Sequence, residues 1–164
     1  MLFFRLKRNI HFLLAVLAAI FVFGSGPAAV AQTDPPLVFQ KLNYEQGLSQ
    51  GYVTSIVQDH SGFIYVGTND GLNRYDSYGF LVFRHDPDDP NSLRSNQINA
   101  LIVDQHGKIW VGTARGLNVY DPETGQFRFI ENRLLTANTY VFSLTFDRDG
   151  VLWVGTFDGG LVSY

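Results

Sequence analysis

The sequence predicts an all-β protein built from repeated four-stranded antiparallel units, and three observations support this. One stretch recurs three times, starting at Asp59, Asp104 and Asp147, so the copies are spaced 45 and then 43 residues apart. Each copy contains short apolar runs separated by turn signals such as Asp-x-x-Gly, in which Asp caps the turn and Gly tolerates a positive φ. No segment after residue 31 shows the apolar periodicity of a helix.

Each copy is predicted to contain four short strands. In the first copy the first strand covers 53–58, and its equivalents begin at 98 and 141. The second strand, 63–68, is a continuous apolar run, which is typical of a strand that is buried on both faces. A glycine turn then leads to a third strand at 72–75. The fourth strands are predicted at 80–85 and, in the second copy, at 127–131.

Four-stranded units with a period of 40–50 residues are typical of the blades of a β-propeller. We therefore expect a propeller domain in residues 32–164, with blades at about 52–86, 97–131 and 140–164. Residues 37–42 align with a fourth strand, although no first, second or third strand precedes them. A closed ring needs at least four blades, so the sequence predicts an incomplete ring, the opening arc of a larger propeller.

Residues 1–31 have the pattern of a secretory signal peptide. Three basic residues precede the uncharged apolar stretch 12–23, and Ala29-Val30-Ala31 supplies a small-x-small cleavage site. We expect cleavage before Gln32. The alternative is a retained membrane anchor, but a stretch this short spans only ~18 Å as a helix, against ~30 Å of hydrocarbon. Either way the chain is predicted to be exported, and a sequence without cysteine suits the periplasmic side of a bacterial inner membrane.

Composition excludes several classes of function. The chain has no Cys, which rules out disulfides, Cys-ligated zinc and thiol redox chemistry. Its 12 basic and 15 acidic residues give a net charge of −3 without a basic run, so we expect no nucleic-acid partner. The acidic cluster at 86–89 and the Asp-x-Asp-Gly at 147–150 are interpreted as a solvated linker and a hairpin turn. We expect no metal, no cofactor and no catalysis by this chain.

The repeats resemble those of the two-component regulator propeller family. The resemblance rests on the string 104–117, on the linker 84–93 and on the entrance segment 45–49, and it extends over 37–164. It implies the N-terminal sensory propeller of a bacterial membrane receptor, homodimeric at full length, whose output is a histidine kinase or a diguanylate cyclase outside this sequence. WD40 repeats fit less well, because Trp110 and Trp153 are followed by Val rather than Asp.

We expect a ligand site where the loops entering each first strand meet the turns between second and third strands, because both emerge at one end of a propeller and vary between copies. The ligand is predicted to be a periplasmic small molecule or an oligosaccharide. Arg115 is the strongest candidate, since a guanidinium offers a planar fork of donors. The candidate residues are Tyr52, Asp70, Gln97, Arg115, Tyr140 and Asp158. Two alternatives remain open at this point: a propeller enzyme acting on glycans, and a scaffold for receptor dimerisation.

Overall fold

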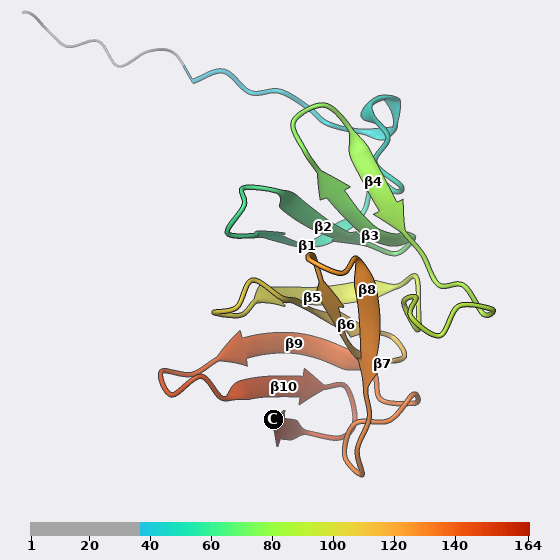
Figure 1. Cartoon of the computed structure of the whole chain (residues 1–164), viewed down its shortest axis with the longest axis vertical. Helices are drawn as coiled ribbons and strands as arrows, with labels where there is room; N and C mark the ends of the chain where they lie inside the picture. Colours follow the sequence, from blue (N-terminus) through green and yellow to red (C-terminus); the bar gives the residue numbers. More distant parts are fainter. Residues whose placement is uncertain (1–36) are drawn as a thin grey trace, which may run out of the picture. The chain divides into compact units, whose positions relative to one another are not determined.

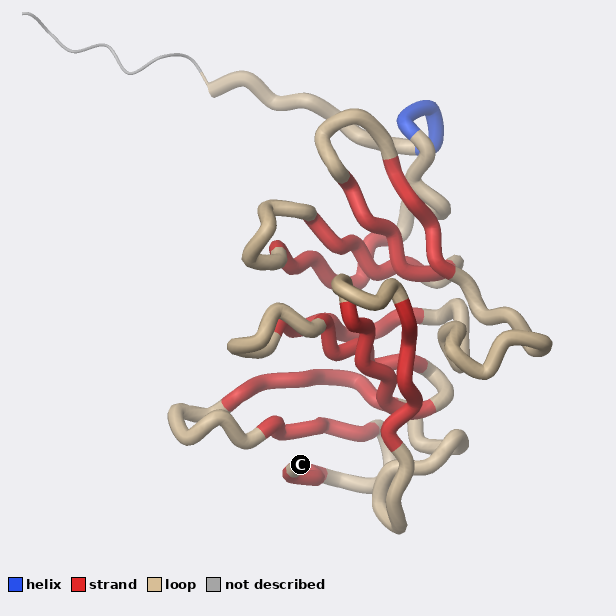
Figure 2. The backbone as a smooth tube through the Cα atoms, viewed as in Figure 1, coloured by secondary structure: helices blue, strands red, loops and turns tan. Residues whose placement is uncertain are grey.

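The computed structural model describes residues 37–164, of which Gln40–Tyr164 form one compact unit. The predicted signal peptide and its cleavage site lie outside the described residues. Figure 2 shows strands joined by loops and turns, and the single-turn helix η1 (Tyr44–Gln46) is the one helix of the described part. Within 37–164, no helix has the length and apolarity that a membrane crossing requires.

The strands form three antiparallel sheets, each a blade in which strands adjacent in sequence are paired (Figure 1). The first blade contains β1 (Val53–Gln58), β2 (Ile64–Thr68), β3 (Gly71–Tyr75) and β4 (Phe80–Phe83). The second contains β5 (Ile98–Val103), β6 (Ile109–Thr113), β7 (Gly116–Asp121) and β8 (Gln126–Ile130). The third contains β9 (Val141–Phe146), β10 (Leu152–Thr156) and β11 (Leu161–Ser163). These three blades confirm the predicted propeller architecture, and the ring is not closed within the described residues.

The strand predicted at 37–42 is wrong for this structure. Residues 37–43 belong to no strand. Leu37, Val38 and Phe39 are 85–90% exposed. A strand forms where another strand offers it a free row of backbone donors and acceptors, and no described strand pairs with this segment. The alignment of apolar residues predicted a fourth strand, but it did not show which strand would pair with it.

Neighbouring blades approach closely through a glycine in the second strands of the first two blades. A Cβ atom built on Gly67 would lie 2.8 Å from Cγ2 of Ile98, and one built on Gly112 would lie 2.6 Å from Cγ1 of Val141. Both contacts are far inside van der Waals range, so only glycine allows the first strand of the next blade to pack here. This explains why the repeat carries Gly-Thr at the end of each second strand.

A bulge in each first strand adds a polar link between blades. The register of β1, β5 and β9 shifts at the same place in each blade, around Thr54, Asn99 and Phe142. The Thr54 hydroxyl donates to the Ile98 carbonyl at 2.8 Å, and Nδ2 of Asn99 donates to the Val141 carbonyl at 2.8 Å. The first two blades therefore each bind the next one through the bulged side chain.

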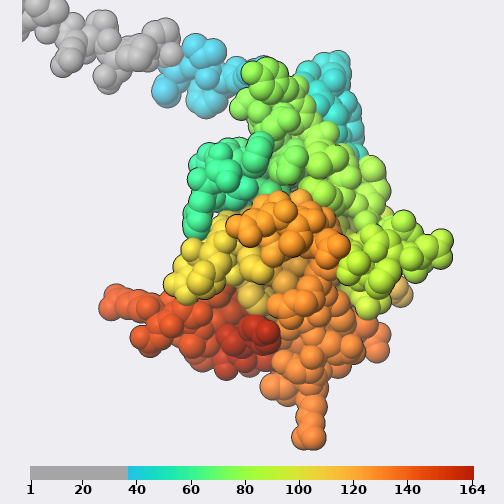
Figure 3. Space-filling view, in the orientation of Figure 1, coloured from blue at the N-terminus to red at the C-terminus, as the bar shows by residue number. Residues whose placement is uncertain are grey.

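Apolar packing between blades follows the same repeat. Tyr120 of the second blade lies against Tyr65 of the first, with ring centroids 6.0 Å apart. Tyr164 of the third blade lies against Trp110 of the second at 5.4 Å. β6, between the two interfaces, is buried at all five of its positions, as its continuous apolar run predicted. In the space-filling view the blades are packed directly against one another (Figure 3).

Candidate functional site

The blades have two ends with different chemistry. We call the end that carries the β1–β2, β5–β6 and β9–β10 turns the turn end; it is on the left in Figure 1. The opposite end carries the β2–β3, β6–β7 and β10–β11 turns and the loops that enter β1, β5 and β9, and we call it the loop end. The sequence predicted ligand binding at the loop end and structural caps at the turn end.

At the turn end the three copies make the same hydrogen bonds. Oδ1 of Asp104 accepts from the backbone N–H of His106 at 2.8 Å and of Lys108 at 2.9 Å. Asp59 and Asp147 each accept the two equivalent bonds in their own turns. The aspartates thus satisfy the donors of each hairpin, which confirms their predicted role as caps.

The second carboxylate oxygen holds a tryptophan in two of the copies. Nε1 of Trp110 donates to Oδ2 of Asp104 at 2.9 Å, and Nε1 of Trp153 donates to Oδ2 of Asp147 at 2.8 Å. The Trp153 bond and the turn amides lower the pKa of Asp147 below the usual aspartate value, because they favour its charged form. The first copy has Tyr65 at this position instead.

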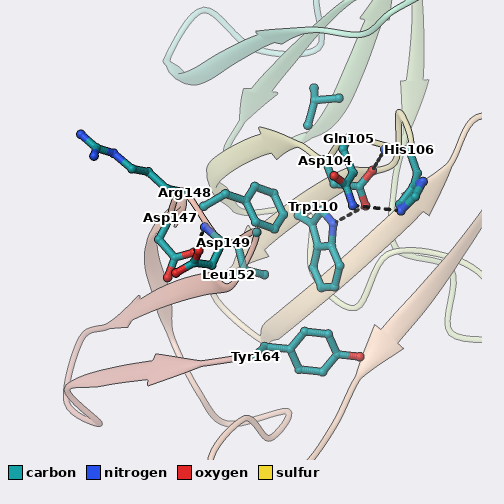
Figure 4. A pocket seen from close by; sticks show the side chains of 12 residues that line it. Asp104, Gln105, His106, Trp110, Asp147, Arg148, Asp149, Leu152 and Tyr164 are labelled. Atoms are coloured by element: carbon teal, nitrogen blue, oxygen red, sulfur yellow. Dashed lines mark hydrogen bonds between the residues drawn. The ribbon is translucent and has the colours of Figure 1, made fainter.

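A hollow of about 530 Å³ lies between the turns of the second and third blades (Figure 4). It contains Asp104, Trp110, Asp147 and Asp149, so its residue types suggest a polar ligand site. However, Asp104 and Asp147 already accept hydrogen bonds on both carboxylate oxygens from their own turn and tryptophan. We therefore assign this hollow to the packing of the hairpins.

At the loop end, loops and turns from different blades are joined by backbone hydrogen bonds. The Gly71 N–H donates to the Asn96 carbonyl, and the Gly116 N–H donates to the Thr139 carbonyl, both at 2.7 Å. In each case a turn of one blade holds the loop that enters the next blade. The predicted convergence of these segments is therefore present in the structure.

Three of the six predicted binding residues, Tyr52, Gln97 and Tyr140, line one hollow of about 540 Å³ at the loop end. They come from the loops that enter the first strands. We call this the central hollow. The rest of its wall comes from the first strands β1, β5 and β9 of the three blades, and from Asn69 in the β2–β3 turn. Its full lining consists of Tyr52, Val53, Thr54, Asn69, Gln97, Asn99, Tyr140 and Phe142.

A chain of hydrogen bonds crosses this hollow from the second blade to the third. Nε2 of Gln97 donates to the Tyr140 hydroxyl at 2.8 Å, and that hydroxyl donates to Oδ1 of Asn99 at 3.2 Å. Asn99 also makes the bond to the Val141 carbonyl that links the two blades. The Tyr140 ring rests edge-on against Phe157, with centroids 6.0 Å apart. The site residues are thus part of the contact between blades.

The other three predicted residues lie elsewhere on the loop end. Asp70 is held by Arg84, whose Nη2 and Nε donate to its carboxylate at 2.9 and 3.2 Å, and this pairing lowers the pKa of Asp70. Arg115 lines a separate hollow with His85 and Arg94. Asp158 is exposed on the turn before β11. The sequence could locate the loop end but not these side-chain partners.

Thr54, Asn69, Asn99 and Phe142 line the central hollow but were not among the predicted residues. The sequence held a signal for three of them. Thr54, Asn99 and Phe142 occupy one aligned position that varies between copies, whereas the apolar residue before it is retained as Val53, Ile98 or Val141. A variable position directly after a retained apolar residue indicates a side chain that is released from core packing.

Comparison with known proteins agrees with this architecture. Three segments, residues 47–70, 92–115 and 135–158, match the family model described as two component regulator propeller. The structure is similar to the extracellular domain of the putative hybrid two component system BT3049 from B. thetaiotaomicron, with a TM-score of 0.65 and 31% identity over 76% of this chain. It is also similar to the extracellular domain of BT4673 from the same organism, with a TM-score of 0.60 and 34% identity over 73% of this chain.

One curated relative is a protein named Histidine kinase P4 from Formosa agariphila, which is 43% identical over 56 residues, or 34% of this chain. The chain spans 20% and 16% of the two solved domains and 4% of the kinase. Each matched segment of the family model runs from the loop that enters a first strand to the turn after the second strand, and there is one such segment in every blade. The chain is therefore a member of the two component regulator propeller family.

Proposed function

We propose that this chain is the ligand-sensing part of the extracytoplasmic domain of a bacterial signal-transduction receptor, and that the ligand binds in the central hollow. The observation that carries the proposal is the grouping of Tyr52, Gln97 and Tyr140 around a hollow of about 540 Å³. This volume lies within the range of about 300–1,000 Å³ that is usual for small-molecule sites. The similarity to extracellular domains of putative hybrid two component systems supports the assignment to a receptor.

The lining of the central hollow favours a neutral ligand that is rich in hydroxyl groups. All its polar side chains are uncharged amides and hydroxyls, and its aromatic residues are Tyr52, Tyr140 and Phe142. Amides donate and accept hydrogen bonds with hydroxyl groups, and aromatic faces pack against the C–H faces of a ring. A sugar unit of an oligosaccharide meets both requirements.

Binding in this hollow offers a route to a signal. The Tyr140 hydroxyl is bonded to Gln97 and Asn99, and Asn99 holds the third blade through the Val141 carbonyl. A ligand hydroxyl that takes over one of these bonds changes the link between two blades. A ligand that binds one arrangement of the blades better than another shifts the population toward it. We propose that the remainder of the receptor, acting as a dimer, reads this shift across the membrane.

The test is a reporter assay in the full-length receptor with a panel of neutral oligosaccharides. Tyr140→Phe removes the hydroxyl but keeps the ring, and Tyr78→Phe is its matched control, because Tyr78 is 98% exposed on the β3–β4 turn. We expect Tyr140→Phe to raise the half-maximal ligand concentration about tenfold, as expected for one lost hydrogen bond. The control should leave it unchanged.

Two results would overturn the proposal. If the Tyr140→Phe receptor responds to an activating sugar like the wild type, the ligand does not bind in the central hollow. A wild-type receptor that responds to none of the neutral sugars, but does respond to a charged ligand, would contradict the assigned ligand class.

A further inference from the structure

A second hollow of about 250 Å³ lies at the loop end, apart from the central hollow. Its lining comes from the end of the first blade, from the loop that enters β5, from the β6–β7 turn and from the loop that enters β9. The lining residues are His85, Arg94, Arg115, Ala137 and Asn138. Two of these five are arginines, and none is a carboxylate. We call this hollow the arginine hollow.

Arg94 is held in place at both its backbone and its side chain. Its N–H donates at 3.3 Å to Oδ1 of Asn118, which is fully buried in β7. Its guanidinium carbon lies 5.0 Å from the centroid of the Phe129 ring, a cation–π arrangement. The cation–π contact therefore restrains the guanidinium against Phe129, which lines a neighbouring hollow together with Arg94.

Arg115 stands on a tight turn whose backbone is fixed on both sides. Its N–H donates to Oγ1 of Thr113 at 3.0 Å, and the N–H of the next residue, Gly116, donates to the Thr139 carbonyl at 2.7 Å. Gly116 has a φ of +87°, a value that L side chains rarely adopt. The turn therefore presents Arg115 from a defined position beside Asn138.

His85 is anchored to the same loop. Its N–H donates to Oδ1 of Asn96 at 2.6 Å, and Nδ1 lies 2.6 Å from the Leu93 carbonyl oxygen. A carbonyl oxygen only accepts, so Nδ1 carries the hydrogen. Nε2 has no hydrogen-bond partner in the described part of the chain and remains available to a ligand.

The first blade shows what is different about the arginine hollow. Asp70 and Arg84 align with Arg115 and Glu131, so the charges are reversed between blades. In the first blade the pair closes at 2.9 Å. Residues 37–164 contain two ion pairs, Arg84–Asp70 and Lys108–Asp121, and neither uses Arg94 or Arg115. The second blade thus keeps two positive groups around one hollow without an ionic partner.

We propose that the arginine hollow binds the oxyanion group of a ligand, a carboxylate, sulfate or phosphate. Arg94 and Arg115 are both exposed and line one hollow that no carboxylate lines, so the local potential favours an anion. Planar guanidinium forks are matched to oxyanions and bind them through paired, charge-assisted hydrogen bonds. Asn138 and His85 supply further polar atoms. This site does not depend on the central hollow, whose polar lining is uncharged.

The test is equilibrium dialysis of the full-length receptor with labelled inorganic sulfate, with phosphate and glucuronate as competitors. Arg115→Ala and Arg94→Ser each remove one guanidinium; Ser is the residue at the aligned position of the first copy, Ser49. Arg148→Ala is the matched control, because Arg148 is exposed at the turn end and its loss changes the net charge equally. We expect Arg115→Ala and Arg94→Ser to weaken sulfate binding at least about tenfold. Arg148→Ala should leave it unchanged.

The competitors distinguish the source of the oxyanion. Displacement of sulfate by phosphate alone indicates a tetrahedral group, and displacement by glucuronate alone indicates a carboxylate. Equal loss of affinity in Arg148→Ala would show a bulk charge effect and overturn the proposal. The proposal would also be overturned if no sulfate binds at about 10 mM, because the dissociation constant would then be too high for a functional site. Tyr140→Phe should bind sulfate normally, so failure at one hollow does not imply failure at the other.

Discussion

The two ends of the blades use the same repeat in opposite ways. At the turn end, Asp59, Asp104 and Asp147 make the same backbone bonds in all three copies. At the loop end, the β2–β3, β6–β7 and β10–β11 turns carry Asp70, Arg115 and Asp158 at one aligned position. Within a single chain, uniform residues therefore mark the end at which each hairpin is capped within its own blade. Varied residues on the same scaffold mark the loop end, where we propose that the ligand binds.

The largest expected effect on stability is at the close contact between the second and third blades, where Gly112 faces Val141. We expect Gly112→Ala to lower the free energy of unfolding by about 1–3 kcal/mol, as overpacking does, because its Cβ would lie 2.6 Å from Val141. Gly79→Ala is the control, since a Cβ there meets no atom within 4 Å. Thermal and denaturant unfolding measure both. Equal stability of the two variants would show that the blades do not need the glycine.

The next effect concerns the turn end, where two copies differ in one bond. Asp104 binds two backbone amides and the Trp110 indole, whereas the described contacts of the Asp59 carboxylate are the two amides alone. Asp104→Ala should therefore cost more stability than Asp59→Ala, by the ~0.5–1.5 kcal/mol of one hydrogen bond. Denaturant unfolding of both variants measures the difference. If Asp59→Ala is the more damaging, the indole bond does not stabilise the turn.

Acid should weaken the turn end through Asp147. Its folded pKa lies below its usual value, mainly because of the Trp153 hydrogen bond, so the carboxylate stabilises the fold above the unfolded pKa. That contribution is lost as the pH falls through the folded pKa, below about pH 4. Melting temperatures recorded from neutral pH downward should fall less steeply for Asp147→Asn than for the wild type. If the melting temperatures of the two proteins fall equally with pH, the Asp147 carboxylate is not the cause of the acid sensitivity.

The smallest effect is expected at Tyr65, which replaces the tryptophan in the first copy. Its buried hydroxyl has no hydrogen-bond partner among residues 37–164, and burial raises its pKa above the usual tyrosine value. Tyr65→Phe should change stability by less than about 0.5 kcal/mol, because no bond is lost. The raised pKa means that the wild type loses stability as the pH rises above about 10, and the variant should lose less. A large loss at neutral pH would reveal a partner for the hydroxyl.

Sequence repetition predicted the strands and the turn end well because both depend on local chemistry. The β1 strand has the predicted bounds, 53–58, and the aspartate caps bond within their own turns. The grouping of the candidate residues was predicted only in part, since three of the six line one hollow. Whether Asp70 is free or bound depends on Arg84, which lies fourteen residues away, directly after β4. The separation of Arg115 from Tyr140 likewise depends on the paths of two loops.

The most direct test of the difference between the two ends is hydrogen–deuterium exchange of the full-length receptor with and without an activating oligosaccharide. We predict slower exchange on binding in the loop-end segments 50–54, 96–99 and 138–142. The turn-end segments 59–63, 104–108 and 147–151 should exchange at the same rate in both states. Protection confined to the turn-end segments would contradict the assignment of binding to the loop end.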